Sequence, residues 1–180
     1  MVILSLKEEA YQIIDDLDIM GLLRSYGRAE VVGSVSLNLI VKRDIDIHVY
    51  ILLQDPNAMA GEIVPILLDK KWVRNLRVDK YSSKKAVKIG IDGYPGPTGP
   101  WDIDIWLTND INTTGFEITK ILSENLSNEQ RDAILVIKQY YHSLGVLRDG
   151  LSSRIYDAVY YHDVRSVEDF KDYLPTLKQS

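Results

Sequence analysis

The amino-acid sequence predicts an α/β (α+β) protein with a mixed β-sheet core, flanking helices and a helical C-terminal lobe. Three observations lead to this fold class. Apolar residues near the N-terminus recur at helical spacing, the middle of the chain alternates apolar and polar residues as strands do, and after about residue 120 the pattern is helical throughout. This order is typical of helices that cover a sheet. We expect residues 1–120 to form the core with its N-terminal helix, and residues 121–180 to form a helical segment packed on it, or both to form a single compact domain.

The composition is that of an ordinary globular protein, and it limits the range of partners. Of the 180 residues, 46% are hydrophobic and 26% are charged, and the net charge is −5. This acidic charge disfavours a nucleic-acid partner, although a bound divalent cation would still allow ATP to bind. Cysteine is absent, which excludes disulfides and thiolate metal sites. The sequence shows no signal-peptide pattern and no run long enough to cross a bilayer, so we expect a cytoplasmic protein without a membrane partner.

The first elements are a helix, a short strand and a brief turn. Ser5 and Glu8 form a capping-box pattern, and the apolar residues that follow keep helical spacing up to Gly21, the expected stop. We therefore predict one helix over residues 5–21. The sequence AEVVGS then indicates a short buried strand, and SVSLNLI a brief turn or helix.

The middle of the chain alternates strand patterns with one helix. DIDIHVYILL places isoleucines and valine on one face and polar residues on the other. Asp55 and Pro56 resemble an N-cap and first helical position, so we predict a helix that Pro65 kinks or limits. VRNLRVDKYS and KKAVKIGIDG indicate two further strands, and WDIDIWLT a third. The intervening YPGPTGP is rich in proline and glycine, and we expect a loop without regular structure.

The last third of the chain predicts three helices. Ser127 and Gln130 form a second capping-box pattern, which opens a helix that Gly145 ends. SSRIYDAVYYH keeps helical spacing, and Ser166 caps a final helix that we expect Pro175 to close.

Three Asp-x-Asp triplets occur, and two of them stand out. Asp16 and Asp18 fall in the predicted N-terminal helix, where residues two apart do not share a face. The other triplets lie on predicted strands, where residues two apart point the same way. Aspartate is a poor strand former and neighbouring carboxylates repel each other. Two such pairs, at the starts of otherwise apolar strands, indicate carboxylates gathered to bind a cation: Asp44 with Asp46, and Asp102 with Asp104.

A Gly-Ser pair before the first of these strands suggests what the cation would accompany. Gly33 ends the short predicted strand and would let the backbone approach a bulky anion, and Ser34 offers a hydroxyl and an N–H group. Lys42 and Arg43, just before the aspartates, could neutralise phosphate oxygens. Donors for phosphate beside hard oxygen ligands for metal are what a triphosphate with Mg²⁺ requires.

These residues resemble the signature of the nucleotidyltransferase superfamily, which includes DNA polymerase beta, the aminoglycoside and lincosamide nucleotidyltransferases and the minimal nucleotidyltransferase antitoxins. The match consists of Gly33-Ser34, nine intervening residues, and Asp44-Ile45-Asp46. It extends over roughly residues 29–107. The later segments SSRIYDAVYYHDV and FKDYL show a weaker similarity to small uncharacterised bacterial members of the superfamily. The motif requires ordered elements as well as residue types.

The resemblance implies a fold, an activity and a set of ligands. It implies a mixed sheet with helices, in which Asp44 and Asp46 hold two Mg²⁺ ions and a third carboxylate completes the metal site or deprotonates the acceptor hydroxyl. Asp104 is the first choice for this third carboxylate and Asp102 the alternative. Gly33, Ser34, Lys42 and Arg43 would contact the nucleotide, ATP or another nucleoside triphosphate. The expected reaction transfers a nucleoside monophosphate, AMP by preference, to a hydroxyl group of a small molecule or a protein.

Other interpretations remain open at this point. The fold could serve as a non-catalytic or regulatory binding module, such as a toxin-neutralising partner. A metal-dependent hydrolase would need a water-activating residue that the sequence does not reveal. Asp92 and Glu117 are less favoured third carboxylates, and His48 fits a surface position on a strand better than a ligand position. The acceptor, the base of the nucleotide and the oligomeric state are not set by the sequence.

Overall fold

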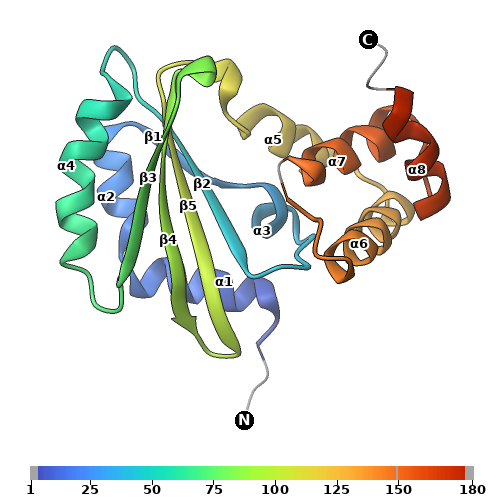
Figure 1. Ribbon diagram of the computed structural model, residues 1–180, viewed down its shortest axis with the longest axis horizontal. Coiled ribbons are helices and arrows are strands. Elements are labelled where there is room, and N and C mark those ends of the chain that lie inside the picture. Colours follow the sequence, from blue (N-terminus) through green and yellow to red (C-terminus); the bar gives the residue numbers. More distant parts are fainter. Residues whose placement is uncertain (1–3, 149, 177–180) are drawn as a thin grey trace. The chain divides into compact units, whose positions relative to one another are not determined.

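The structure is a computed structural model that describes residues 4–148 and 150–176. The chain divides into two compact units, residues 1–120 and 121–180, and each is described by itself (Figure 1). Whether these units are separate domains stays a prediction. None of the described helices is long and apolar enough to cross a membrane.

The first unit is built on a mixed sheet of five strands. The strands run in the order β1-β2-β5-β4-β3, and only the pairing of β2 with β5 is parallel. The predicted fold class is therefore confirmed, and each predicted strand is present. The strands are β1 (Arg28–Val32), β2 (Asp44–Tyr50), β3 (Asn75–Tyr81), β4 (Ala86–Gly96) and β5 (Gly99–Thr108).

The core of this unit lies on one face of the sheet. Three helices pack there, α1 (Leu6–Asp16), α2 (Ile19–Tyr26) and α4 (Pro56–Leu68), and Figure 1 shows α2 and α4 on one side of the strands. Alternation along β2 and β5 turns the isoleucines inward, and Ile45, Ile47 and Ile105 are fully buried. Burying each such side chain contributes about 1.5–3 kcal/mol. This apolar face fixes the register, and so fixes the residues that the opposite face presents.

The N-terminal segment differs from the single helix predicted for residues 5–21. The capping box of Ser5 and Glu8 is present, but α1 ends at Asp16 and α2 begins after Asp18, whose φ of 46° is left-handed. Aspartate tolerates this conformation better than most residues, so the chain can turn there. Gly21, the expected stop, lies inside α2.

The predicted YPGPTGP loop is also wrong, because these residues form a β-hairpin. β4 runs to Gly96 and β5 begins at Gly99, with Tyr94 opposite Trp101. The fully buried Glu9 of α1 anchors the turn: its carboxylate accepts hydrogen bonds from the Thr98 N–H (3.0 Å), the Thr98 hydroxyl (2.7 Å) and the Trp101 indole N–H (2.9 Å). A contact from a distant helix therefore overrides the local composition.

The helix α3 (Gly33–Leu37) is the brief helix expected after β1, and α5 (Phe116–Asn125) crosses the boundary between the units. The second unit continues with α6 (Asn128–Ser143), α7 (Leu151–Tyr161) and α8 (Val167–Thr176). The capping box of Ser127 and Gln130 opens α6 as predicted. The expected stop at Pro175 is wrong, because α8 continues through it to Thr176.

Candidate active site

The four strand aspartates lie next to one another on the face of the sheet opposite the core. Parallel pairing of β2 with β5 sets Asp44 opposite Asp102 and Asp46 opposite Asp104. Neighbouring strands are about 4.8 Å apart, so the two sequence-distant pairs become one cluster. The structure therefore brings together all four carboxylates that the sequence singled out.

The Asp46 carboxylate carries the largest electrostatic penalty in this cluster. Burial raises its pKa, and the negative charges of Asp44 and Asp104 raise it further, to about 7. Asp46 makes no hydrogen bond or ion pair with any residue that the structure describes. Burial also raises the pKa of Asp44, although the nearby charge of Lys42 opposes this rise. The charges of Lys42 and Lys88 lower the pKa of Asp46 but do not offset these effects, so a bound cation would stabilise this carboxylate further.

Two lysines form ion pairs with the three other carboxylates of the cluster. The Lys42 ammonium lies 3.2 Å from Asp44 Oδ2 and 4.0 Å from Asp102 Oδ2. The Lys88 ammonium lies 3.0 Å from Asp104 Oδ2, and burial opposes its charge, but the hydrogen bond and the charge of Asp104 outweigh burial and raise the lysine pKa. Lys88 is a site residue that the sequence did not suggest. The alternation along β4, which turns Lys88 to the polar face, was the available signal.

The two candidates for the third carboxylate differ in their surroundings. The Asp104 side chain is 20% exposed and lies opposite Asp46, and its negative charge raises the pKa of Asp46. The Asp102 side chain is 46% exposed, and its Oδ1 accepts a hydrogen bond of 3.1 Å from the Gly93 N–H. This geometry favours Asp104. Asp92, a less favoured candidate, is held by Arg77 through two hydrogen bonds of 2.7 and 2.8 Å.

The Gly-Ser turn lies beside the carboxylates. Antiparallel pairing of β1 with β2 sets Val32 opposite Asp46, so Gly33 and Ser34 follow at the edge of the cluster. Gly33 has a φ of +63°, and a Cβ atom there would lie 3.8 Å from Asp46 Oδ2. Its N–H donates a hydrogen bond of 3.2 Å to the Thr119 hydroxyl, a contact that the sequence did not suggest. Glycine therefore both permits the turn and keeps the space above Asp46 open.

Arg43 is not brought to the cluster. Its guanidinium donates hydrogen bonds of 3.2 and 2.7 Å to the Thr98 hydroxyl, which in turn donates to Glu9. The side chain therefore belongs to the hairpin anchor described above. Lys42, its neighbour in the sequence, is the residue that contacts the carboxylates.

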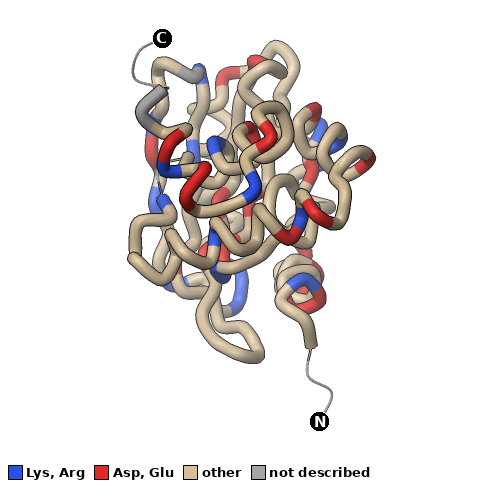
Figure 2. The backbone as a smooth tube through the Cα atoms, turned by 90° about the vertical axis from the view of Figure 1, so that its right-hand side faces the viewer, with Lys and Arg blue, Asp and Glu red and all other residues tan. Residues whose placement is uncertain are grey.

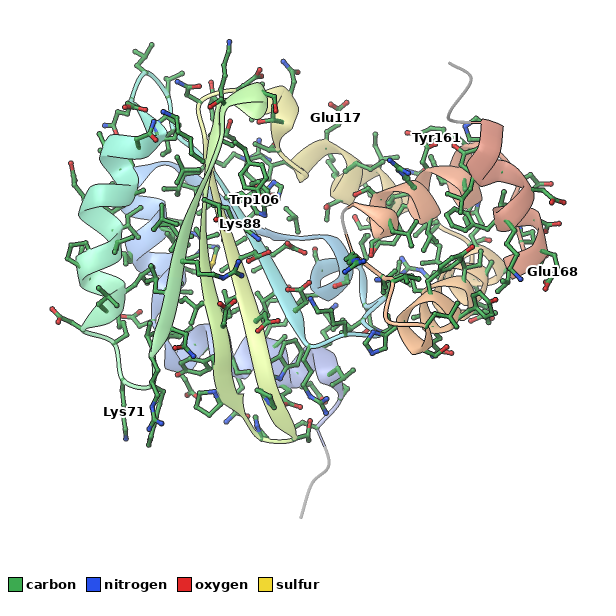
Figure 3. The ribbon with its side chains drawn as sticks, in the orientation of Figure 1. Lys71, Lys88, Trp106, Glu117, Tyr161 and Glu168 are labelled. Carbon is green, nitrogen blue, oxygen red and sulfur yellow. The ribbon has the colours of Figure 1, made fainter. Side chains whose placement is uncertain are left out.

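An aromatic group continues the polar face beyond Asp104. Trp106 follows Asp104 on the same face of β5, and Figure 3 shows it beside Lys88. Its ring centroid lies 4.8 Å from that of Tyr81 and 6.1 Å from that of His48. His48 Nδ1 accepts a hydrogen bond of 2.8 Å from the Gly115 N–H, so this histidine positions the chain after β5.

The cluster fits Mg²⁺ in the kind of donor it offers. Carboxylate oxygens are the ligands that Mg²⁺ prefers, and Asp46 forms no hydrogen bond or ion pair with the residues that the structure describes. Among the described residues, however, no three carboxylate or histidine side chains converge closely enough to hold an ion. Asp44 and Asp104 are engaged by lysines instead. Binding an ion would therefore require these side chains to turn from the lysines toward Asp46.

Comparisons with known proteins identify the fold. No protein-family model and no curated protein sequence matches the chain. Among solved structures, the polymerase core of TRAMP, an RNA surveillance complex, is similar with a TM-score of 0.61 and 20% identity over 84% of this chain and 48% of its own. The Cid1 poly(U) polymerase with bound Mg and 3′-dATP is similar with a TM-score of 0.58 and 17% identity, over 75% of this chain and 42% of its own.

A third similar structure is a cytoplasmic RNA terminal U-transferase, with a TM-score of 0.56 and 15% identity over 76% of this chain and 41% of its own. The chain thus spans less than half the length of these proteins. At such identities the similarity establishes the fold. The mixed sheet and its flanking helices share the fold of these polymerase and transferase structures, as the resemblance to the nucleotidyltransferase superfamily led us to expect.

Proposed function

We propose that the chain is a Mg²⁺-dependent nucleotidyltransferase, which moves a nucleoside monophosphate from a nucleoside triphosphate to a hydroxyl group. The observation that carries this proposal is the position of Asp46. It lies between the Gly33 turn and the Asp104 carboxylate, its pKa is raised to about 7, and it forms no direct ion pair with any described residue.

The side chains of the first unit would divide the work. Asp44, Asp46 and Asp104 would hold two Mg²⁺ ions, with Asp102 as the alternative third ligand. The bound ions would supply positive charge to the phosphate oxygens. The Gly33 turn and Ser34 would donate to the triphosphate, and Lys42 would add a charge at the same edge. Arg43 was expected to join them, but its contact with Thr98 assigns it to the hairpin.

The proposed reaction is an in-line displacement at the α-phosphorus. The acceptor oxygen forms a bond to the α-phosphorus while the bond from this atom to the α,β-bridging oxygen breaks. Pyrophosphate leaves with the bonding electrons. The hydroxyl proton would pass to a base, and Asp104 is our first candidate for this role. The protein contributes mainly by positioning the reactants and balancing their charge.

The structural neighbours support a nucleoside triphosphate as donor. The Cid1 structures hold Mg with 3′-dATP, MgATP or MgGTP. We propose ATP as the first donor to test, and a small molecule or a protein as the acceptor, because the net charge is −5. In the view of Figure 2, acidic and basic segments are interspersed along the tube. The 3′ end of an RNA is a second candidate acceptor, because two of the neighbours are described as a poly(U) polymerase and an RNA terminal U-transferase.

Labelled nucleotides test the proposal directly. Each of the four triphosphates, labelled at the α- or the γ-phosphate, would be incubated with Mg²⁺ and either an RNA oligonucleotide or a panel of metabolites and proteins. We expect the α-label to move to an acceptor and the γ-label to leave as pyrophosphate. Asp46→Asn should abolish both changes. Transfer of the γ-label would contradict the proposal, and binding without any turnover would favour a regulatory module.

A further inference from the structure

We propose that Lys88 is a positioning residue, which holds Asp104 in the metal-free protein and releases it to the divalent cation that arrives with the nucleotide. The inference rests on the proposed function, because it concerns the metal site assigned there. It adds a residue from a strand, β4, that contributes none of the proposed metal ligands.

The position of Lys88 is built by the sheet. Lys88 lies on β4 opposite Trp106 on β5, one step along the same face from Asp104. Its ammonium lies 3.0 Å from Asp104 Oδ2 and 5.6 Å from the centroid of the Trp106 ring. Only 13% of the lysine side chain is exposed. An ion pair this sheltered is held by its surroundings, unlike a flexible pair at the surface.

Lys42 provides an internal comparison. It lies in the segment before β2 with 44% of its side chain exposed, so it can move aside when a ligand arrives. Lys88 extends from a strand between two others and has little room to move away. Asp46 forms no ion pair with a lysine among the described residues, although the charges of Lys42 and Lys88 both act on it. The three proposed metal ligands are therefore held to different degrees in the metal-free protein.

This difference explains why the carboxylates do not converge. An incoming cation must compete with Lys88 for Asp104 Oδ2, and the lysine charge itself repels the cation. The triphosphate adds oxygen ligands and negative charge, which shift this competition toward the cation. Lys88 would thus keep the affinity for a bare cation low and make cation binding depend on the nucleotide. When Asp104 turns away, the Trp106 ring offers the ammonium a second contact.

Mn²⁺ binding measured by electron paramagnetic resonance, without nucleotide and then with ATP, tests this role. We expect Lys88→Met to bind Mn²⁺ about tenfold more tightly than the wild type without nucleotide, which corresponds to about 1.4 kcal/mol. The gain in affinity that ATP gives should shrink by a similar factor. Lys88→Arg should restore wild-type behaviour within about twofold. Lys80→Met is the matched control, because Lys80 lies on β3 and its side chain points to the other face.

The outcomes separate this inference from the proposed function. A wild-type protein that binds no Mn²⁺, even with ATP, would overturn the proposed metal site and this inference with it. If the wild type binds Mn²⁺ normally and Lys88→Met binds it equally well or more weakly, only the role of Lys88 is overturned. Such a result would mean that Lys88 does not lower the affinity of the wild-type site for the metal, as expected of a lysine with a purely structural role. Lys88→Gln, which keeps a polar side chain, replaces Lys88→Met if the latter does not fold.

Discussion

Replacing Asp46 by asparagine should stabilise the metal-free protein while abolishing its proposed activity. Burial and the charges of Asp44 and Asp104 raise the pKa of Asp46 from 3.8 to about 7. Each pKa unit corresponds to about 1.4 kcal/mol, so the charged form destabilises the fold by at most about 4 kcal/mol. The side chain keeps some contact with solvent and shares its charge with neighbours. We therefore expect Asp46→Asn to raise the free energy of unfolding of the metal-free protein by about 1–3 kcal/mol at pH 8, which corresponds to about 3–10 °C in melting temperature.

The pH dependence of this gain identifies its cause. A carboxyl group whose pKa is raised on folding contributes stability at low pH and loses it as the pH rises from about 4 to about 7. The advantage of Asp46→Asn should therefore be full above pH 7 and nearly vanish near pH 4. Thermal melts in EDTA across this range measure it. Asp79→Asn, at an exposed strand carboxylate 3.6 Å from Arg77, should change stability by about 0.5 kcal/mol or less. A destabilised Asp46→Asn protein at pH 8, or a gain independent of pH, would refute this reasoning.

Three further predictions concern the turn and the hairpin. Gly33→Ala should lower the free energy of unfolding in urea by about 1–2 kcal/mol, because the φ of +63° at this position strains an alanine. The same substitution should weaken the binding of ATP with Mg²⁺. Gly96→Ala should lower the free energy of unfolding by more than about 2 kcal/mol, because its Cβ atom would lie 2.5 Å from the Trp101 ring. Gly61→Ala is the control: its Cβ atom would have nothing within 4 Å, so the free energy of unfolding should rise by about 0.5–1 kcal/mol. Arg43→Ala should lower the melting temperature yet leave nucleotide affinity within about twofold in calorimetry. Equal losses of affinity in Arg43→Ala and Lys42→Ala would contradict the assignment of Arg43 to the hairpin.

The carboxylate cluster could be predicted because local rules govern it. Aspartate and isoleucine alternate in β2 and β5, so the sequence already shows which side chains share a face. The pairing of β2 with β5, which makes Asp46 a neighbour of Asp104, is a long-range event. The resemblance to a known family suggested it, and the strand patterns alone did not.

One expected site residue lies apart from the carboxylates. Lys42 and Arg43 are consecutive, and both were predicted to contact the nucleotide, but the structure turns Lys42 to Asp44 and Arg43 to Thr98. Residues 41–43 form a bend before β2, so the alternation of a strand does not separate the two side chains in advance. A role for Arg43 in nucleotide binding stays a prediction, which the Arg43→Ala measurement tests.

The features that the sequence did not reveal depend on contacts between distant segments. Lys88 joins Asp104 through the pairing of β4 with β5, and Thr119 reaches Gly33 from α5. The hairpin at the end of β4 is fixed by Glu9, a residue of the first helix. Local composition describes the conformational preferences of a segment, and such distant partners can outweigh them.

Isothermal titration calorimetry of nucleoside triphosphate binding, in Mg²⁺ and in EDTA, tests the central claim most directly. It would use the wild type and Asp46→Asn with ATP, GTP, CTP and UTP in turn. We expect at least one nucleotide to bind the wild type in Mg²⁺ and this binding to be lost in EDTA. Asp46→Asn should bind that nucleotide at least about tenfold more weakly, because the cation loses an anionic ligand. Equal affinities in Mg²⁺ and EDTA, or an Asp46→Asn protein that binds as well as the wild type, would contradict it.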